Sequence, residues 1–260
     1  MNLIEYFNKF VRIITFLTPV TDCCMSFPSI SGSCFFLKFN NEFIVITAGH
    51  VFKDFSVENL KILLNPFAKN TNDSHRLLSL AGGFNFFNGS RFDVNYDADA
   101  YDFCILNVAK EELEEDLNSF FWEYSPPQNS YFSLDNDVIV AGYPTIEQEI
   151  DFDSSLGIFS MVSLSAKISN VDNTMLHFCL KTMPNALKSF DGFSGAPVFY
   201  KTRDNVWQIL GWVIRGSSTS GILHCINIRM IEAAMKSYKE CIADGRKPDY
   251  IGEFYNDGSL

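Results

Sequence analysis

The sequence predicts an all-β protein. Short apolar runs separated by turn residues follow one another along most of the 260 residues, a pattern typical of a β-barrel or a β-sandwich. Hydrophobic residues make up 47% of the chain and aromatic residues 15%, and 26 residues are Phe. This is enough apolar surface for a large core and argues against disorder. The pattern alone leaves barrel and sandwich open.

The first half of the chain is expected to begin with a helix and continue as strands. Apolar side chains recur at helical spacing over residues 2–12, which predicts a short amphipathic helix. Residues 33–39 and 42–48 predict two strands joined by a tight turn at Asn40-Asn41. The acidic segment 110–122 is helix-prone. Further strands are expected at 59–67, 75–81 and 103–108.

A linker is predicted at residues 125–130, where Pro, Ser and Asn are concentrated. We place the junction of two sub-domains there. The chain after this linker is predicted to form short strands up to residue 228. These strands are expected at 137–142, 156–168, 174–182, 197–201, 206–215 and 221–228. Residues 229–243 have helical periodicity and are predicted to form a helix.

Charge and cysteine usage exclude several function classes. The net charge of −11 disfavours nucleic acid as a partner. Seven cysteines cannot all pair, and none has zinc-ligand spacing, so we expect buried free thiols, no metal, no cofactor and a cytoplasmic location. The apolar stretch 13–17 is a poor secretory signal, and no run is long enough for a membrane helix.

Two motifs indicate nucleophilic catalysis. Ser194 lies in the run Gly192-Phe193-Ser194-Gly195-Ala196-Pro197, where glycines allow a tight turn that presents a hydroxyl. A serine hydroxyl needs a base within hydrogen-bond reach. His50 ends an apolar strand in the context Thr47-Ala48-Gly49-His50, and it is the only one of the four histidines with such a motif.

An aspartate is expected to orient the histidine. Asp102 opens the apolar run Asp102-Phe103-Cys104-Ile105-Leu106, and a strand entrance would hold a carboxylate firmly. Asp97 and Asp99 are close competitors in the preceding loop. We favour Asp102 and leave the other two open.

The order His50, Asp102, Ser194 and the motifs around these residues resemble those of the trypsin-like serine peptidases. The resemblance covers roughly residues 30–240 and implies two six-stranded antiparallel β-barrels of the chymotrypsin-like fold, with a short N-terminal helix and a C-terminal helix. It also implies an oxyanion hole formed by the N–H groups of Gly192 and Ser194. The domains expected on this basis are an N-terminal helix and strand extension (1–24), an N-terminal β-barrel (25–124), a C-terminal β-barrel (125–228) and a C-terminal helix with a tail (229–260).

The chain departs from the digestive enzymes of this family. Phe193 stands where those enzymes place an aspartate that pairs with a newly cut N-terminus, and Arg12-Ile13-Ile14 lacks the glycines of an activation site. We therefore expect no activation by N-terminal cleavage. The turn Gly142-Tyr143-Pro144 is nearer to bacterial HtrA-type protease domains, here expected without a PDZ domain.

The family register also suggests residues that bind substrate. Ile214-Arg215-Gly216 corresponds to the strand that pairs with the substrate backbone, and His224 lies on the next strand. Lys188, six residues before the nucleophile, argues against cleavage after Lys or Arg and favours a polar or acidic side chain at that subsite.

The leading hypothesis is an intracellular serine endopeptidase that forms an acyl-enzyme with protein or peptide substrates. The alternative is a catalytically latent scaffold or binding protein of the same fold, activated by a regulatory partner protein. A third reading is an esterase that uses the same residues on a smaller acyl group.

Overall fold

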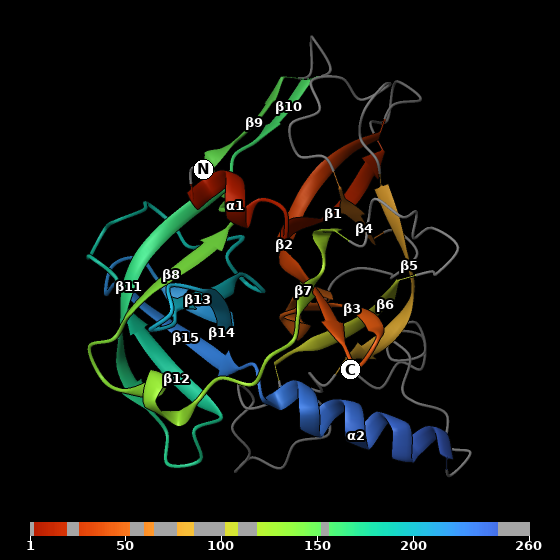
Figure 1. Ribbon diagram of the computed structural model, residues 1–260. Helices are drawn as coiled ribbons and strands as arrows, with labels where there is room; N and C mark the ends of the chain where they lie inside the picture. Colours follow the sequence, from red (N-terminus) through yellow and green to blue (C-terminus); the bar gives the residue numbers. More distant parts are fainter. Residues whose placement is uncertain are drawn as a thin grey trace, which may run out of the picture.

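The computed structural model describes residues 3–19, 26–52, 60–64, 77–85, 102–108, 119–151 and 156–243. Two β-barrels lie side by side, the second on the left of Figure 1 and the first on the right. Within these residues two α-helices accompany the barrels, α1 (Leu3–Phe7) and α2 (Met230–Ala243). The predicted fold class is confirmed.

The first barrel is a ring of antiparallel strand pairs. β1 pairs with β4, and the pairing continues through β5, β6, β3 and β2 back to β1, while the short β7 adds to β2 in parallel. The strands are β1 (Val11–Pro19), β2 (Ser26–Phe39), β3 (Glu42–Thr47), β4 (Leu60–Leu63), β5 (Leu77–Asn85), β6 (Cys104–Val108) and β7 (Trp122–Glu123).

Strand β1 corrects the prediction of a helix over residues 2–12, because the helix ends at Phe7 and the strand begins at Val11. The side chains from Val11 to Ile14 are all buried. A strand that is buried on both faces has apolar residues at successive positions. It therefore lacks the alternation of apolar and polar residues that marks a half-buried strand in a sequence. The first barrel therefore includes residues from the segment that the sequence suggested as an extension.

The turn between β2 and β3 has the predicted position. Phe39 pairs with Glu42, so Asn40 and Asn41 form a two-residue loop, and their φ angles are 48° and 65°. Two consecutive positive φ angles characterise the hairpin turn whose twist matches that of the strands. Asn tolerates this backbone conformation better than most residues do.

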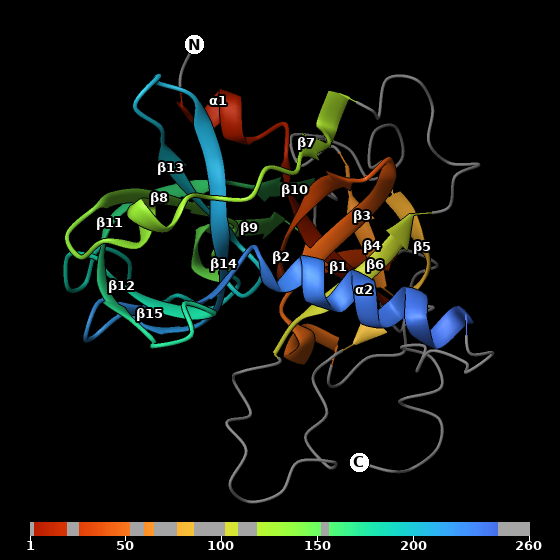
Figure 2. The same cartoon turned by 60° about the horizontal axis from the view of Figure 1, so that its bottom comes forward.

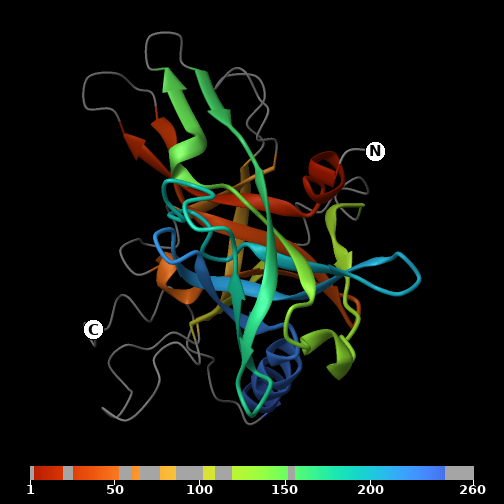
Figure 3. The same ribbon diagram turned by 90° about the vertical axis from the view of Figure 1, so that its left-hand side faces the viewer.

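The second barrel is closed, in the strand order β11-β12-β15-β14-β13-β8. The predicted strand 156–168 is in fact two strands, because β10 pairs with β9 and β11 pairs with β8. The β9–β10 hairpin projects away from both barrels (Figure 3). The strands are β8 (Asp137–Gly142), β9 (Gln148–Asp151), β10 (Leu156–Phe159), β11 (Val162–Val171), β12 (His177–Lys181), β13 (Pro197–Lys201), β14 (Trp207–Ser217) and β15 (Ile222–Asn227).

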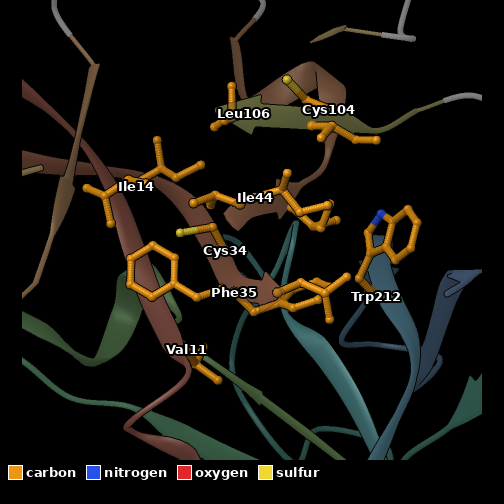
Figure 4. Close-up of a cluster of buried hydrophobic side chains, with 14 of the residues drawn as sticks. Val11, Ile14, Cys34, Phe35, Ile44, Cys104, Leu106 and Trp212 are labelled. Carbon is orange, nitrogen blue, oxygen red and sulfur yellow. The ribbon is translucent and has the colours of Figure 1, made fainter. Parts of the chain in front are cut away.

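One hydrophobic core joins the two barrels. Trp212 of β14 is fully buried, and its ring lies 5.7 Å from that of Phe103 and 6.3 Å from that of Phe35, both in the first barrel. Figure 4 shows this indole facing the side chains of the first barrel. The same core continues to the buried residues at the start of α2, and Figure 2 shows this helix passing in front of the first barrel. The relative position of the barrels is therefore fixed by packing.

The linker crosses between the barrels. β7 pairs within the first barrel and β8 belongs to the second, so the chain changes barrel between residues 124 and 136. The Arg229 guanidinium holds this segment by donating to the Pro127 carbonyl and to Asn129 Oδ1. Among the helices that the structure describes, none has the length and apolar character to cross a membrane.

Candidate active site

His50 lies just beyond the end of β3, in a short 3₁₀ helix, η1 (Gly49–Phe52). Buried neighbours on both sides, Ala48 and Val51, hold this turn in the core. The Ser31 hydroxyl also donates to the Val51 carbonyl, at 2.8 Å. The imidazole itself is about one-third exposed, so a substrate can approach it.

Asp102 is the carboxylate that faces His50. Its Oδ2 lies 2.7 Å from His50 Nδ1, and its Oδ1 accepts the backbone N–H of His50 at 2.9 Å. The residue is buried two positions before β6 begins at Cys104. A carboxylate can only accept hydrogen bonds, so Nδ1 carries a proton and Nε2 is left as a base. The competing Asp97 and Asp99 lie outside the described residues.

Ser194 comes from the second barrel. Its Oγ lies 2.9 Å from His50 Nε2 and 3.4 Å from the carbonyl oxygen of Ile214. The Ser194 carbonyl accepts the N–H of Ser33 at 2.8 Å, which ties the loop of the second barrel to the first. The three residues singled out in the sequence therefore form one hydrogen-bonded line, Asp102 to His50 to Ser194, across the barrel interface.

Two glycines in the Ser194 loop have backbone conformations and surroundings that exclude a side chain. Gly192 has φ of +89°, and a Cβ there would lie 2.4 Å from the Tyr143 carbonyl oxygen. Gly195 has φ of +86°, and a Cβ would lie 2.0 Å from the Ser33 carbonyl oxygen. Positive φ and close backbone approach both select glycine. The Gly-x-Ser-Gly spacing is thus a geometric requirement of this loop.

Phe193, between Gly192 and Ser194, is fully buried. It belongs to the core of the second barrel, where its ring meets the edge of Phe190 at 6.0 Å. The loop is consequently anchored by an apolar side chain at a position where the secreted relatives use a charge. The sequence predicted that the charge is missing, but it did not predict this burial.

The residues predicted to bind substrate do not all lie together. Arg215 and His224 are cross-strand partners on β14 and β15 and line one cavity of about 260 Å³ together with Ile214. Gly216 lies farther along β14, where a Cβ would be 2.4 Å from Leu223 Cδ2. Lys188 is exposed and does not line the cavity.

The other walls of the cavity carry polar side chains beside Phe178 and Cys225. Asn170, Asp172, His177 and Cys179 contribute to it, and Cys179 Sγ lies 3.6 Å from His224 Nδ1. Burial raises the pKa of the Cys179 thiol, although the charge of Arg215 opposes this. A raised pKa keeps a thiol protonated and weakly nucleophilic. Ile214, Arg215 and His224 are expected from the sequence to contact substrate. Asn170, Asp172, His177 and Cys179 carry no local motif that predicts a cavity, because its walls come from separate strands.

The described part of the chain contains no cluster of three metal-ligating side chains. Its cysteines Cys34, Cys104, Cys179 and Cys225 are free. Burial raises the pKa of Cys34, Cys104 and Cys225. The other cysteines, Cys23, Cys24 and Cys241, have no described side chain.

Two comparisons bear on this geometry. A search of curated proteins found no match to the chain. The family model described as Trypsin matches residues 30–233, which is most of the sequence and includes His50, Asp102 and Ser194. Together with the double barrel, this match shows that the chain belongs to the trypsin family of serine peptidases.

Proposed function

We propose that this protein is a serine endopeptidase that cleaves protein substrates through an acyl-enzyme. The observation that carries the proposal is the hydrogen-bonded line from Asp102 through His50 to Ser194, with distances of 2.7 and 2.9 Å. These distances are within the range that proton transfer from a nucleophile to a base requires.

In the proposed mechanism Ser194 Oγ attacks the scissile carbonyl carbon while His50 Nε2 takes the hydroxyl proton. The N–H groups of Gly192 and Ser194 stabilise the oxyanion of the tetrahedral intermediate. His50 then gives its proton to the leaving amine, which breaks the peptide bond, and water releases the acyl group by the same steps. Asp102 holds the imidazole in one tautomer and stabilises the imidazolium.

The proposed substrate path runs along β14. The backbone of Ile214-Arg215-Gly216 is assigned the role of pairing with the substrate chain, and Arg215 and His224 that of contacting its side chains. Basic groups here, together with Lys188 near the nucleophile loop, support a preference for polar or acidic substrate residues. A clean preference for Lys or Arg in a peptide-library digest would overturn this specificity.

A fluorophosphonate probe tests the mechanism without knowledge of the substrate. The wild-type protein should be labelled, and both Ser194→Ala and His50→Ala should abolish labelling. Ser133→Ala, which removes an exposed hydroxyl that donates to the Ser130 carbonyl, is the matched control and should be labelled normally. Absence of labelling under all conditions would favour the latent scaffold activated by a partner.

The substrate class needs a second experiment. New protein N-termini should appear in cells that express the wild type and not in cells that express Ser194→Ala. Labelling by the probe without any new N-termini would favour the esterase instead of the endopeptidase.

We also propose that the enzyme is cytoplasmic and nearer to HtrA-type domains than to secreted zymogens. The four cysteines with described side chains are free, which supports a reducing compartment. The buried Phe193, which stands in place of the aspartate of the zymogens, supports the relationship to HtrA-type domains.

A further inference from the structure

The orientation of three consecutive peptide groups decides whether the Ser194 loop can bind an oxyanion. The first joins Asp191 to Gly192, and its carbonyl accepts the N–H of Thr145 at 2.8 Å. The described peptide bonds are all trans, and in a planar trans peptide the N–H points opposite to the C=O. The hydrogen bond from Thr145 therefore turns the Gly192 N–H away from the 145 turn.

The second peptide group joins Gly192 to Phe193, and Ser33 holds it. Ser33 Oγ accepts the Tyr143 N–H at 2.9 Å, so its own proton is free to go to the Gly192 carbonyl, 2.7 Å away. At the other end of the same peptide, the Phe193 N–H donates to the Phe190 carbonyl at 3.0 Å. A flip of this peptide would break both bonds in a site where Ser33 is fully buried, which is costly.

The third peptide group joins Phe193 to Ser194. Its carbonyl accepts the Ala196 N–H at 2.8 Å, so the Ser194 N–H points the other way. Within the part of the chain that the structure describes, the N–H groups of Gly192 and Ser194 have no acceptor. Both remain available to an oxyanion.

Ser33 is itself rigidly placed. Its N–H donates to the Ser194 carbonyl at 2.8 Å, and its carbonyl accepts the Thr47 hydroxyl at 2.8 Å. Every hydrogen-bonding group of this residue is thus used, and one side chain links the turn after β8 to the nucleophile loop. Such a buried and fully satisfied network specifies a single arrangement.

We propose that Ser33, through its hydroxyl, and Thr145, through its backbone N–H, are positioning residues that preform the oxyanion hole in the uncleaved chain. The proposal rests on the proposed peptidase function. Two hydrogen bonds and the buried Phe193 would then order the nucleophile loop, as a new N-terminus does in the secreted relatives. Activation then needs neither cleavage nor a partner.

Two variants remove the hydrogen bonds that orient these peptide groups. Ser33→Ala removes the donor to the Gly192 carbonyl and also the acceptor of the Tyr143 N–H. Thr145→Pro removes the N–H that faces Asp191, and it suits the site because Thr145 begins a 3₁₀ turn and Pro144 before it has an extended ψ of 137°. The matched controls are Ser133→Ala, at an exposed serine whose hydroxyl donates to the Ser130 carbonyl, and Thr145→Ala, which keeps the backbone N–H that faces Asp191.

The probe is a fluorophosphonate, whose phosphoryl oxygen occupies the oxyanion position, and p-nitrophenyl acetate provides a second acylation rate. Both test variants should react about 10- to 100-fold more slowly than wild type, because a misaligned donor loses part of the 10²–10³ that one donor contributes. The controls should react within about twofold of wild type. The pH dependence of labelling, which reports the protonation of His50, should keep its shape.

The outcomes separate the two hypotheses. If wild type is labelled at Ser194 and both test variants react at the wild-type rate, the positioning role is wrong while the peptidase proposal stands. An equal loss in the controls, or an altered pH dependence in both test variants, also overturns the positioning role, since the damage is then general. If wild type is never labelled, the peptidase proposal itself fails.

Discussion

Asp102 illustrates how one side chain can serve two purposes in this site. One oxygen fixes the backbone at His50, and the other fixes the ring. Because both contacts come from the same buried carboxylate, the position of the turn and the tautomer of the base are coupled. An amide at this position would preserve the first contact and disturb the second.

We predict that Asp102→Asn lowers the turnover of p-nitrophenyl acetate by about 10⁴ at neutral pH. The amide oxygen can still accept the His50 N–H, but the NH₂ group facing Nδ1 would favour the tautomer whose proton is on Nε2. Asp137→Asn, which changes an exposed aspartate on β8, is the control and should leave turnover unchanged. Turnover that is nearly unaffected in Asp102→Asn would show that another acid orients the histidine.

The catalytic residues were visible in the sequence because each lies in a short local motif. The residues that support them were not visible. Ser33 reaches Gly192 across 159 positions of the sequence, and no local pattern distinguishes its hydroxyl from that of Ser31. Thr145 acts through its backbone, which carries no signal in the residue type. Lys188 is predicted to bind substrate only from its position six residues before Ser194, and in the structure it is exposed.

Among the elements, short apolar runs bounded by turn residues identified the hairpin at Asn40-Asn41 and strand β13, whose bounds agree with the predicted 197–201. They did not identify β1, because apolar residues at helical spacing over 2–12 predicted a helix into which the start of this strand falls. The position of β1 has a consequence for activation. The Arg12–Ile13 bond lies inside a paired strand, and Arg12 is only 2% exposed, so a protease cannot reach this bond in the folded protein.

The nucleophile loop should depend on Phe193 for its stability. Phe193→Ala is expected to lower the free energy of unfolding by about 3–5 kcal/mol, because it leaves a cavity in the core of the second barrel. Urea denaturation followed by circular dichroism measures this change. Leu134→Ala, at a side chain that is 61% exposed, should stay within about 0.5 kcal/mol of wild type. A similarly small loss in Phe193→Ala would mean that the loop is not held by apolar packing.

At the scale of the whole molecule, the active site depends on how the two barrels pack. His50 and Asp102 come from the first barrel and Ser194 from the second, and the core around Trp212 lies between them. This arrangement follows from contacts distant in sequence. Strand patterns alone therefore left barrel and sandwich undecided, and only the family resemblance resolved the choice.

Trp212→Ala should destabilise the protein by about 3–5 kcal/mol and also slow labelling of Ser194 under conditions where the protein stays folded. The physical reason is that a void at the barrel interface lets the two halves of the site shift, and small displacements weaken catalysis strongly. Val206→Ala, which changes a side chain that is 54% exposed, is the control for both measurements. Unchanged labelling in folded Trp212→Ala would show that the geometry of the site does not depend on packing between the barrels at Trp212.

The hydrogen bond from His50 Nε2 to Ser194 Oγ leads us to expect that Ser194 is a competent nucleophile without cleavage of the chain. Intact mass spectrometry after reaction with a fluorophosphonate tests this most directly, followed by mapping of the modified peptide. We expect one adduct per chain, located on Ser194, with the N-terminus uncut and no partner added. No adduct, an adduct on another residue, or an adduct that requires cleavage or a partner would contradict it.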